Sequence, residues 1–196
     1  MRVIKEFQSK KNKVYLVEYP VYDIAVKKVH TNIDCFNNEV KILATLSAVR
    51  APKVYSYDFP NIYMEYIEGD LLLDEIMSAS TEEQDIIGKK VINFLNWFLD
   101  KTKGLIQTDY NFRNFIIKND CCYGIDFENT QEGDINTCVA KMIAFCYLYD
   151  FEKSKKKAFC QSLLKYSAVN IKDIFDLISH EINFLKSRRC IQKSSN

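Results

Sequence analysis

Apolar and polar residues alternate along most of the first third of the chain, which predicts a β-rich region. The alternating runs are rich in Val, Ile, Tyr and Leu, which suit a pleated and half-buried surface. Five short strands are expected, at Val3–Phe7, Val14–Tyr19, Asp23–Val29, Val54–Phe59 and Asn61–Tyr66. Between the third and fourth strands, apolar side chains in residues 34–47 recur three or four positions apart, which predicts one helix.

From residue 80 onward the apolar spacing becomes that of helices. Ser80 and Glu83 form a capping box at the start of the first helix. Three more helices are expected toward the C-terminus, at 136–149, 152–168 and 171–189. Gly69 interrupts the pattern between the two halves. We therefore expect an N-terminal part of residues 1–68 and a C-terminal part of residues 69–196.

The composition limits what such a chain can be. Its 196 residues are 47% apolar, enough for one substantial domain or two small lobes. A net charge of +1 offers no general electrostatic argument for a nucleic-acid or membrane partner. No apolar run approaches the roughly 18 residues of a membrane span, and the N-terminus lacks the apolar segment of a secretory signal. We therefore expect a cytoplasmic protein without a membrane partner.

Seven cysteines occur at irregular spacings, with no C-x-x-C pair, and the two histidines stand far apart in the chain. A zinc site would need cysteine and histidine ligands at close, regular spacing. A Ser-His-Asp or Cys-His arrangement would need a histidine beside its nucleophile. The sequence argues against both, and we expect a reduced chain with buried thiols.

Oxygen-bearing side chains stand at the ends of two short apolar segments in the middle of the chain. Asp109 and Asn114 form the pattern D-x-x-x-x-N just before Phe115-Ile116-Ile117, and Asp126 ends the following segment. In phosphoryl transfer, one carboxylate accepts the proton of the attacking hydroxyl group, while an amide oxygen and a second carboxylate bind Mg²⁺ on the nucleotide phosphates. The pattern therefore favours phosphoryl transfer over the alternative of an ordinary surface hairpin.

The segments Gln107–Asn114 and Gly124–Glu128 resemble the catalytic and metal-binding loops of the protein-kinase-like superfamily. They look most like the aminoglycoside phosphotransferase branch and small microbial kinase-like proteins, in which an acidic residue such as Glu128 often replaces the glycine of D-F-G. The resemblance implies an α+β, two-lobed protein-kinase-like fold, with a small β-rich N-lobe that holds one helix and a compact, mostly helical C-lobe. It also implies ATP as the phosphoryl donor and Mg²⁺ as the metal.

The same resemblance assigns roles to side chains of the central hairpin. Asp109 is expected to be the catalytic base, and Asn114 and Asp126 are expected to be the Mg²⁺ ligands. Arg113 precedes the metal-binding amide and could contact the transferred phosphate or an anionic acceptor. A solvated loop arginine is the alternative for Arg113.

A cation near the phosphates is expected on the third strand. Ile24-Ala25-Val26-Lys27 matches the V-A-I-K strand of kinases, and Ala25 and Lys27 share one face of a strand. Lys28 would point to the other face, so the pattern favours Lys27 as the lysine that reaches the phosphates. Glu39, on the following helix, is the expected ion-pair partner of Lys27. For both residues the alternative is an ordinary solvated side chain.

The string from Met64 to Ile67 resembles the hinge of kinases. On this pattern the carbonyl of Glu65 and the amide of Ile67 face adenine. Met64 lines the pocket behind the adenine ring. A simple edge strand is the alternative interpretation of the same residues.

Three departures from the kinase pattern reduce the support around the site. The loop 8–13 should cover the phosphates but contains no glycine, so Ser9 and backbone amides are expected to contact them. Gln107 stands where kinases have histidine. Cys138 stands where many relatives have an aspartate that braces the catalytic loop, and the nearby Asp134 could substitute. These losses favour the alternative of a kinase-like module that binds nucleotide, or a partner, without turnover.

The acceptor is expected to be a small molecule with a hydroxyl group. The segment between Asp126 and the next predicted helix is too short for the peptide platform of a protein kinase, and no A-P-E string occurs. The acceptor cleft should include Asp109, Arg113 and Glu128. A compact atypical protein kinase stays an alternative, because small protein kinases tied to tRNA-modification complexes are similarly short.

The C-terminal residues 151–196 carry ten Lys and Arg side chains against four Asp and Glu side chains, a net charge of +6. Most such runs are solvated helix faces, which is the favoured interpretation. An anionic acceptor or an RNA partner is the alternative. The tail lacks the interleaving of aromatic and basic side chains that single-stranded nucleic acid requires.

Overall fold

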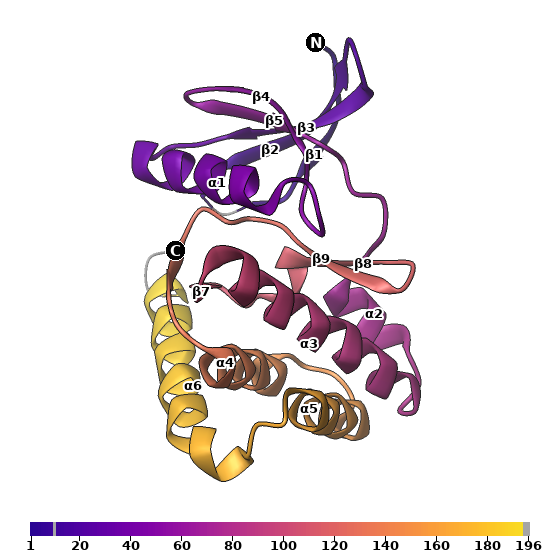
Figure 1. Cartoon of the computed structure of the whole chain (residues 1–196), viewed down its shortest axis with the longest axis vertical. Coiled ribbons are helices and arrows are strands. Elements are labelled where there is room, and N and C mark those ends of the chain that lie inside the picture. Colours follow the sequence, from indigo (N-terminus) through magenta and orange to yellow (C-terminus); the bar gives the residue numbers. More distant parts are fainter. Residues whose placement is uncertain (10, 194–196) are drawn as a thin grey trace.

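The computed structural model describes residues 1–9 and 11–193, and its elements form two lobes (Figure 1). Lys10 of the predicted polar loop lies outside the described residues, as do the side chains of residues 189–193, which include Arg189 and Lys193 of the basic tail. The N-lobe is a sheet with one helix, and the C-lobe is mostly helical. The domain boundary between residues 68 and 69 stays a prediction.

The N-lobe sheet has five antiparallel strands in the order β1-β2-β3-β5-β4. Along the chain they are β1 (Val3–Phe7), β2 (Lys13–Tyr19), β3 (Asp23–Val29), β4 (Val54–Asp58) and β5 (Asn61–Met64). All five strands that the sequence predicts are present. The last strand ends at Met64, before the predicted Tyr66, because the chain leaves the sheet there and crosses to the C-lobe.

The two faces of this sheet have different surroundings. On β3, Lys28 pairs with Ile62, which belongs to the hydrophobic core, whereas Lys27 pairs with Tyr63. Because side chains alternate along a strand, Lys27 and Lys28 face opposite sides of the sheet. The outer face carries a group of aromatic rings in mutual contact, from Tyr19, Tyr22, Tyr55 and Tyr63.

One helix, α1 (Ile33–Leu46), lies between the sheet and the C-lobe (Figure 1). Asn32 caps its N-terminus, because its side-chain oxygen accepts hydrogen bonds from the N–H groups of Asp34 and Cys35 at 2.8 and 3.0 Å. The predicted apolar stripe is buried or packed against the core. Glu39 lies within this stripe at 1% exposure. A carboxylate buried on this face requires a charged or hydrogen-bonding partner.

The C-lobe combines short strands with helices. Its elements are β6 (Asp70–Leu71), α2 (Leu72–Ser78), α3 (Glu83–Thr102), β7 (Leu105–Gln107), β8 (Phe115–Lys118), β9 (Cys121–Gly124), β10 (Thr130–Glu132), α4 (Ile135–Leu148), α5 (Lys153–Ser167) and α6 (Ile171–Lys193). A short 3₁₀ helix, Phe112–Asn114, precedes β8. The strands form two small sheets, β6-β8-β9 and β7-β10. Figure 1 shows α3 running alongside the β8–β9 hairpin.

Local signals set the ends of α3. The N–H of Ser80 donates to Glu83 Oε2 at 2.7 Å, and the N–H of Glu83 donates to Ser80 Oγ at 3.3 Å, which is the predicted capping box. At the other end, Lys103 adopts the left-handed conformation with φ of 57°, and the N–H of Gly104 donates to the Leu99 carbonyl at 2.8 Å. The sequence does not predict α2, because a helix of seven residues is too short to show a helical stripe.

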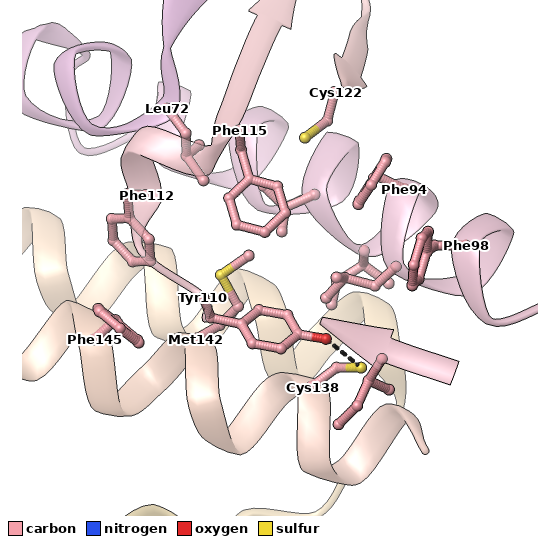
Figure 2. Close-up of a cluster of buried hydrophobic side chains, with 14 of the residues drawn as sticks. Leu72, Phe94, Phe98, Tyr110, Phe112, Phe115, Cys122, Cys138, Met142 and Phe145 are labelled. Carbon is pink, nitrogen blue, oxygen red and sulfur yellow. Dashed lines mark hydrogen bonds between the residues drawn. The ribbon is translucent and has the colours of Figure 1, made fainter. Parts of the chain in front are cut away.

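A cluster of aromatic side chains joins the hairpin to the C-lobe helices (Figure 2). Phe94 of α3 packs on Phe115 with ring centroids 5.7 Å apart, and Phe98 packs on Phe127 at 5.5 Å. Gly124 allows this close approach, since a Cβ atom there would lie 2.5 Å from the Phe94 ring. The packing therefore sets the position of the hairpin, and of the residues that follow it, against α3.

The six cysteines whose side chains are described are all free thiols, and Cys122, Cys138 and Cys146 are buried. Burial raises the pKa of the Cys138 thiol to about 12. Among the described residues, no helix combines the length and the apolar character that a membrane span needs.

Candidate functional site

A cleft of about 700 Å³ lies between the lobes. Its walls come from the loop after β1, the loop 108–114 (the predicted catalytic loop, called the catalytic loop below), the segment after β9, and the helices α4 and α6. Of the predicted site residues, the cleft is lined by Ser9, Asp109, Arg113, Asn114, Asp126 and Glu128. The structure thus brings these six together. The predicted residues that do not line it are Lys27, Glu39, Met64, Glu65 and Ile67.

Hydrogen bonds from the backbone to side chains hold the catalytic loop. Asp109 Oδ1 accepts one from the N–H of Asn111 at 3.0 Å, and Asn111 Oδ1 accepts one from the N–H of Arg113 at 3.0 Å. Asp and Asn form such turns because their short side chains reach the backbone two residues on. Asp109 and Arg113 remain exposed at the cleft.

Buried aromatic side chains alternate with these exposed polar ones. Tyr110 is 1% exposed, and its hydroxyl group donates to Cys138 Sγ at 2.9 Å (Figure 2). Phe112 is fully buried, with the ring centroids of Tyr149 and Phe159 at 5.0 and 5.6 Å. These two anchors hold the catalytic loop against the C-lobe helices.

Asp134 does not brace the catalytic loop. Its carboxylate accepts hydrogen bonds from the N–H and the hydroxyl group of Thr137, both at 2.8 Å, and so caps α4. The contact with the catalytic loop comes instead from Cys138, through Tyr110. The suggested substitution by Asp134 is therefore wrong, because within the described residues its side chain binds Thr137 and makes no hydrogen bond to residues 108–114.

Backbone hydrogen bonds bring Asn114 next to Asp126. The Asn114 carbonyl accepts from the N–H of Ile125 at 2.9 Å, and Gln107 Nε2 donates to the Ile125 carbonyl at 3.1 Å. Gln107, in the usual histidine position, therefore still supports the residue before Asp126. Asn114 Nδ2 donates to the Asp109 carbonyl at 3.3 Å, which leaves the amide oxygen of Asn114 for another partner.

A cluster of charged side chains lies beside Asp126. Lys28 of β3 forms ion pairs with Asp126, with Glu39 at 2.7 Å and with Glu128 at 3.6 Å. The Lys28 side chain is only 8% exposed. One ammonium group therefore joins the N-lobe sheet, α1 and the segment that carries Asp126.

Lys27, the predicted partner of Glu39, lies on the outer face of β3. Its ammonium group is 5.7 Å from the centroid of the Tyr63 ring. The prediction that Lys27 pairs with Glu39 is therefore wrong, and Lys28 makes that ion pair. The V-A-I-K pattern selects Lys27 because that residue shares a strand face with Ala25. An alignment shifted by one residue selects the opposite face, and with it Lys28. Which face is inner depends on α1 and the core, and the four-residue string does not contain that information.

The cluster shifts the pKa values of its members. Burial acts to lower the pKa of Lys28, but the charges of Glu39 and Asp126 outweigh it, and the pKa is raised. Burial acts to raise the pKa of Glu39, but the charge of Lys28 and the contact with His30 lower it. Burial raises the pKa of Asp126, opposed by the charge of Lys28 and assisted by those of Glu39 and Glu128. A divalent cation beside Asp126 would favour the ionised form.

Glu39 also binds the segment that follows Asp126. The N–H of Phe127 donates to Glu39 Oε1 at 3.1 Å, and His30 Nε2 lies 2.8 Å from Glu39 Oε2. The sequence analysis does not assign His30, whose side chain is fully buried. Its spacing from Lys28 is the signal that could have found it, since residues two apart share one face of an extended chain.

The loop after β1 is tied to Glu128. Asn12 Nδ2 donates to Glu128 Oε2 at 2.5 Å, and Lys11 forms an ion pair with Glu128 Oε1 at 3.3 Å. Glu128 and Asn12 are 7% and 8% exposed, so the hydrogen bond between them is largely shielded from water. Ser9 lies on the cleft wall in the same loop. The acidic residue in the D-F-G glycine position therefore gives a glycine-free loop an anchor on the C-lobe.

The predicted hinge residues connect the two lobes. Met64 and Ile67 are 6% and 5% exposed, and the N–H of Glu65 donates to the Lys53 carbonyl at 2.8 Å. Within residues 1–9 and 11–193, neither the Glu65 carbonyl nor the Ile67 N–H has a hydrogen-bond partner. The adenine-binding role of Met64, Glu65 and Ile67 stays a prediction.

The oxygen donors of the cleft suit a metal that is held mainly by a nucleotide. In the part of the chain that the structure describes, no group of three His, Cys, Asp or Glu side chains could hold a metal ion. Asp126 supplies a carboxylate and Asn114 an amide oxygen on the same cleft wall. Mg²⁺ at nucleotide sites takes one or two protein oxygens and completes its shell with phosphates and water. The residues present therefore fit Mg²⁺.

Comparison with known proteins identifies the fold. No family model matches the chain, and no curated protein matches its sequence. The ternary complex of streptomycin, ATP and APH(2'')-IIa matches with a TM-score of 0.66 and 15% identity, over 92% of this chain and 82% of that chain. The ADP-bound aminoglycoside phosphotransferase APH(2'')-Ib matches with a TM-score of 0.65, 14% identity and the same two coverages.

At this level of identity the likeness shows the fold. The chain has the two-lobed, kinase-like α+β fold of these aminoglycoside phosphotransferase structures. The resemblance drawn from Gln107–Asn114 and Gly124–Glu128 is thereby confirmed for the fold.

Proposed function

We propose that the chain is an ATP-dependent phosphotransferase, which transfers the γ-phosphate of ATP to a hydroxyl group of a small molecule. The observation that carries this proposal is the meeting of Lys28 with Glu39 and Asp126 beside an interlobe cleft. Asp109 is exposed in the same cleft. Phosphoryl transfer requires three groups in one site: a cation that binds the phosphates, a carboxylate that binds the metal, and a base that accepts the proton of the acceptor hydroxyl group.

The phosphates of ATP are proposed to lie between Lys28 and the loop after β1. Lys28 replaces Lys27 in this role because its ammonium group reaches Asp126. Glu39 would orient that ammonium group, since the pair is buried at 2.7 Å. Ser9 lies on the cleft wall, where its hydroxyl group could donate to a phosphate oxygen.

Adenine is proposed to bind at the hinge. Its edge presents an amino donor and a ring-nitrogen acceptor, which complement a backbone carbonyl and a backbone N–H. The Glu65 carbonyl and the Ile67 N–H are such a pair, and neither has a partner among the described residues. Met64 is buried at the end of β5 and would lie behind the ring.

Asp126 and Asn114 are the proposed Mg²⁺ ligands, and the bound metal would neutralise charge on the phosphates. Asp109 is the proposed base. The acceptor hydroxyl oxygen forms a bond to the γ-phosphorus as its proton passes to the Asp109 carboxylate. The bond between the γ-phosphorus and the bridging oxygen breaks, and its electron pair leaves with ADP.

The segment after Asp126 supports a small acceptor. Thr130–Glu132 of β10 pairs with Leu105–Gln107 of β7, and Asp134 caps α4. Strand pairing and helix capping therefore engage much of residues 127–134. This leaves little of the segment free to bind a peptide. A protein acceptor is the alternative that the experiment below includes.

Substitution of two aspartates separates metal binding from proton transfer. Asp126→Asn should abolish Mg²⁺-dependent ATP binding, because a neutral amide is a poor ligand for a hard cation. Asp109→Asn should preserve ATP binding and lower turnover by about 10²-fold, the scale of general-base loss. Asp120→Asn is a matched control, because Asp120 is exposed at the turn of the same hairpin. Calorimetry measures binding, and ADP release over a panel of hydroxyl-bearing metabolites measures turnover.

Each outcome of this experiment has a meaning. Equal loss of ATP binding in Asp109→Asn and Asp126→Asn would reject the assigned roles. Binding of Mg²⁺-ATP without transfer to any acceptor would favour the alternative of a binding module. Transfer to generic peptides as efficient as transfer to metabolites would favour a compact protein kinase. No heat of binding with Mg²⁺-ATP would overturn the nucleotide site itself.

A further inference from the structure

Among the residues that the structure describes, two arginines of the cleft have no acidic partner. Arg113 lies on the catalytic loop and Arg188 near the end of α6, and both are exposed and line the same cleft. No ion pair or side-chain hydrogen bond within the described residues includes either guanidinium group. Lys11, the other basic side chain that the structure describes on the cleft wall, is already paired with Glu128.

Within the described residues, the acidic side chains of the cleft contact other groups and not these two arginines. Asp126 is paired with Lys28, and Glu128 is paired with Lys11 and accepts a hydrogen bond from Asn12. Asp109 remains as an exposed carboxylate, and it is the proposed base. Glu39 shares Lys28 with Asp126, so the described charges of the cleft and this cluster balance in number, but Arg113 and Arg188 are the cations among them that no carboxylate contacts.

Arg113 is held on a rigid backbone. Its N–H donates to Asn111 Oδ1 at 3.0 Å, and Tyr149 donates its hydroxyl group to the same oxygen at 2.8 Å. The neighbouring Phe112 is fully buried. The direction of the chain at Arg113 is thus fixed before any ligand binds, which reduces the entropy cost of using its guanidinium group.

Arg188 stands beside an apolar wall. Leu185 lies one helical turn before it and lines the cleft with Phe145 of α4, and each is 7% exposed. The Arg188 guanidinium carbon lies 5.6 Å from the centroid of the Phe184 ring. Figure 1 shows the C-terminal end of α6 at the level of the lobe junction, while the body of the helix packs on α4. This wall is therefore built by the C-lobe helices and not by the loop that covers the phosphates.

We infer that the acceptor is a small hydroxyl compound that also carries an anionic group, a phosphate or a carboxylate, bound by Arg113 and Arg188. The inference rests on the proposed phosphotransferase function and names its acceptor class. Guanidinium groups form paired hydrogen bonds with the oxygens of these anions. The uncharged body of the acceptor contacts Phe145 and Leu185, and its hydroxyl group faces Asp109. A cationic acceptor would meet two like charges at Arg113 and Arg188.

A series of related sugars tests the charge preference. The probes are D-glucose, D-glucosamine, D-gluconate and D-glucose 6-phosphate, titrated by calorimetry without nucleotide and with Mg²⁺ plus a non-hydrolysable ATP analogue. The two anions should bind at least about tenfold more tightly than the neutral and cationic members, the scale of one charge-assisted hydrogen bond. Equal affinity across the series, or no binding of either anion, would overturn the inference.

Charge substitutions locate the binding site. Arg188→Ala and Arg113→Ala should each weaken binding of the anions by about tenfold while ATP affinity changes little. Lys186→Ala is the matched control, because it removes one exposed charge from the same helix outside the cleft. Arg188→Glu should shift the preference toward D-glucosamine. If Lys186→Ala weakens anion binding as much as Arg188→Ala, the binding depends on the overall positive charge of α6 and not on a contact with Arg188. The inference is then wrong.

The measurements separate this inference from the proposed function. Binding of Mg²⁺-ATP together with indifference to acceptor charge would contradict the inference alone. Binding of the anions at Arg113 and Arg188 without any binding of Mg²⁺-ATP would contradict the proposed function.

Discussion

At the residue scale, neighbouring lysines of β3 have opposite surroundings. The Lys28 side chain is 8% exposed among three carboxylates, whereas Lys27 lies over the Tyr63 ring on the outer face. A buried charge that loses its partner keeps its desolvation cost, and a cation over an aromatic ring at the surface contributes little. The same substitution should therefore have very different effects at the two positions.

Lys28→Met should lower the free energy of unfolding by about 3–5 kcal/mol, because Glu39 would be left buried without its main cation. Lys27→Met should lower it by only about 0.5–1 kcal/mol, the scale of an exposed cation–π contact. Urea denaturation followed by circular dichroism measures both values. Similar losses in the two variants would show that the faces of β3 are assigned wrongly.

Glu39→Gln should make the protein less sensitive to acid. The pKa of Glu39 is lowered from its ordinary value of 4.5, so ionised Glu39 stabilises the fold above that pH. The contribution is lost as the pH falls through the lowered pKa. The pKa of Lys28 is raised, so its contribution is complete below 10.5 and stays constant in acid. Asp126, whose pKa is raised, acts in the opposite direction.

Melting temperatures of the wild-type and Glu39→Gln proteins, measured from about pH 7 down to about pH 3, check this prediction. The wild-type protein should be the more stable near neutrality, and the two should converge in acid. A difference that stays constant over the whole range would contradict the role of the Glu39 charge.

At the element scale, α3 and α5 approach closely at Gly88. A Cβ atom on Gly88 would lie 2.2 Å from Ser162 Oγ and 2.6 Å from Ser162 Cβ. Ser162 is 2% exposed, and its hydroxyl group donates to the Asp85 carbonyl at 2.8 Å. The serine therefore cannot move aside without losing a buried hydrogen bond. Glycine, which is unfavourable within a helix, serves here as the contact point of two helices.

Gly88→Ala should lower the free energy of unfolding by about 1–3 kcal/mol, because overpacking outweighs the helix propensity gained. Asn96→Ala, at an exposed position of α3, should change it by no more than about 0.5 kcal/mol. In a double-mutant cycle, Ser162→Gly should reduce the cost of Gly88→Ala. An unchanged cost would mean that the contact with Ser162 is not the cause.

At the scale of the whole molecule, several polar contacts between the lobes meet at residues 126–130, in addition to those that Arg50 makes with Asn93 and Gly124. Asn38 Nδ2 donates to the Phe127 carbonyl at 3.0 Å and to the Glu128 carbonyl at 3.2 Å. The side chains of Lys28 and Asn12 reach the same segment. A ligand bound beside this segment would contact both lobes and stabilise their arrangement.

Mg²⁺ with a non-hydrolysable ATP analogue should therefore raise the melting temperature. A ligand at 100 times its Kd that binds only the folded state adds about 2.7 kcal/mol to the free energy of unfolding. Scanning fluorimetry over a range of ligand concentrations measures the shift. Omission of Mg²⁺ and the Asp126→Asn substitution should reduce the shift to a similar extent. A shift independent of both would contradict the assignment of Asp126 as a metal ligand.

Local signals in the sequence determined much of this fold and part of its site. The strands, the capping box of Ser80 and Glu83 and the β8–β9 hairpin depend on residues that are near one another in the chain. The β8–β9 hairpin brings Asn114 and Asp126 together, and Asp109 lies only five residues before Asn114 in the loop between β7 and β8. That these side chains line one cleft can be predicted from spacing and residue type, whereas their chemical roles stay predictions.

Only the tertiary structure decided which surfaces meet across the chain. Lys28, and not Lys27, pairs with Glu39 because α1 and the core set the inner face of the sheet. Asn12 reaches Glu128 across the lobe junction, and Arg188 reaches the cleft because α6 packs on α4. A local sequence pattern determines which side chains share one face of a strand and which form an apolar stripe on a helix. The face that becomes buried depends on distant segments, because the free energy of burial is gained only when two surfaces come together.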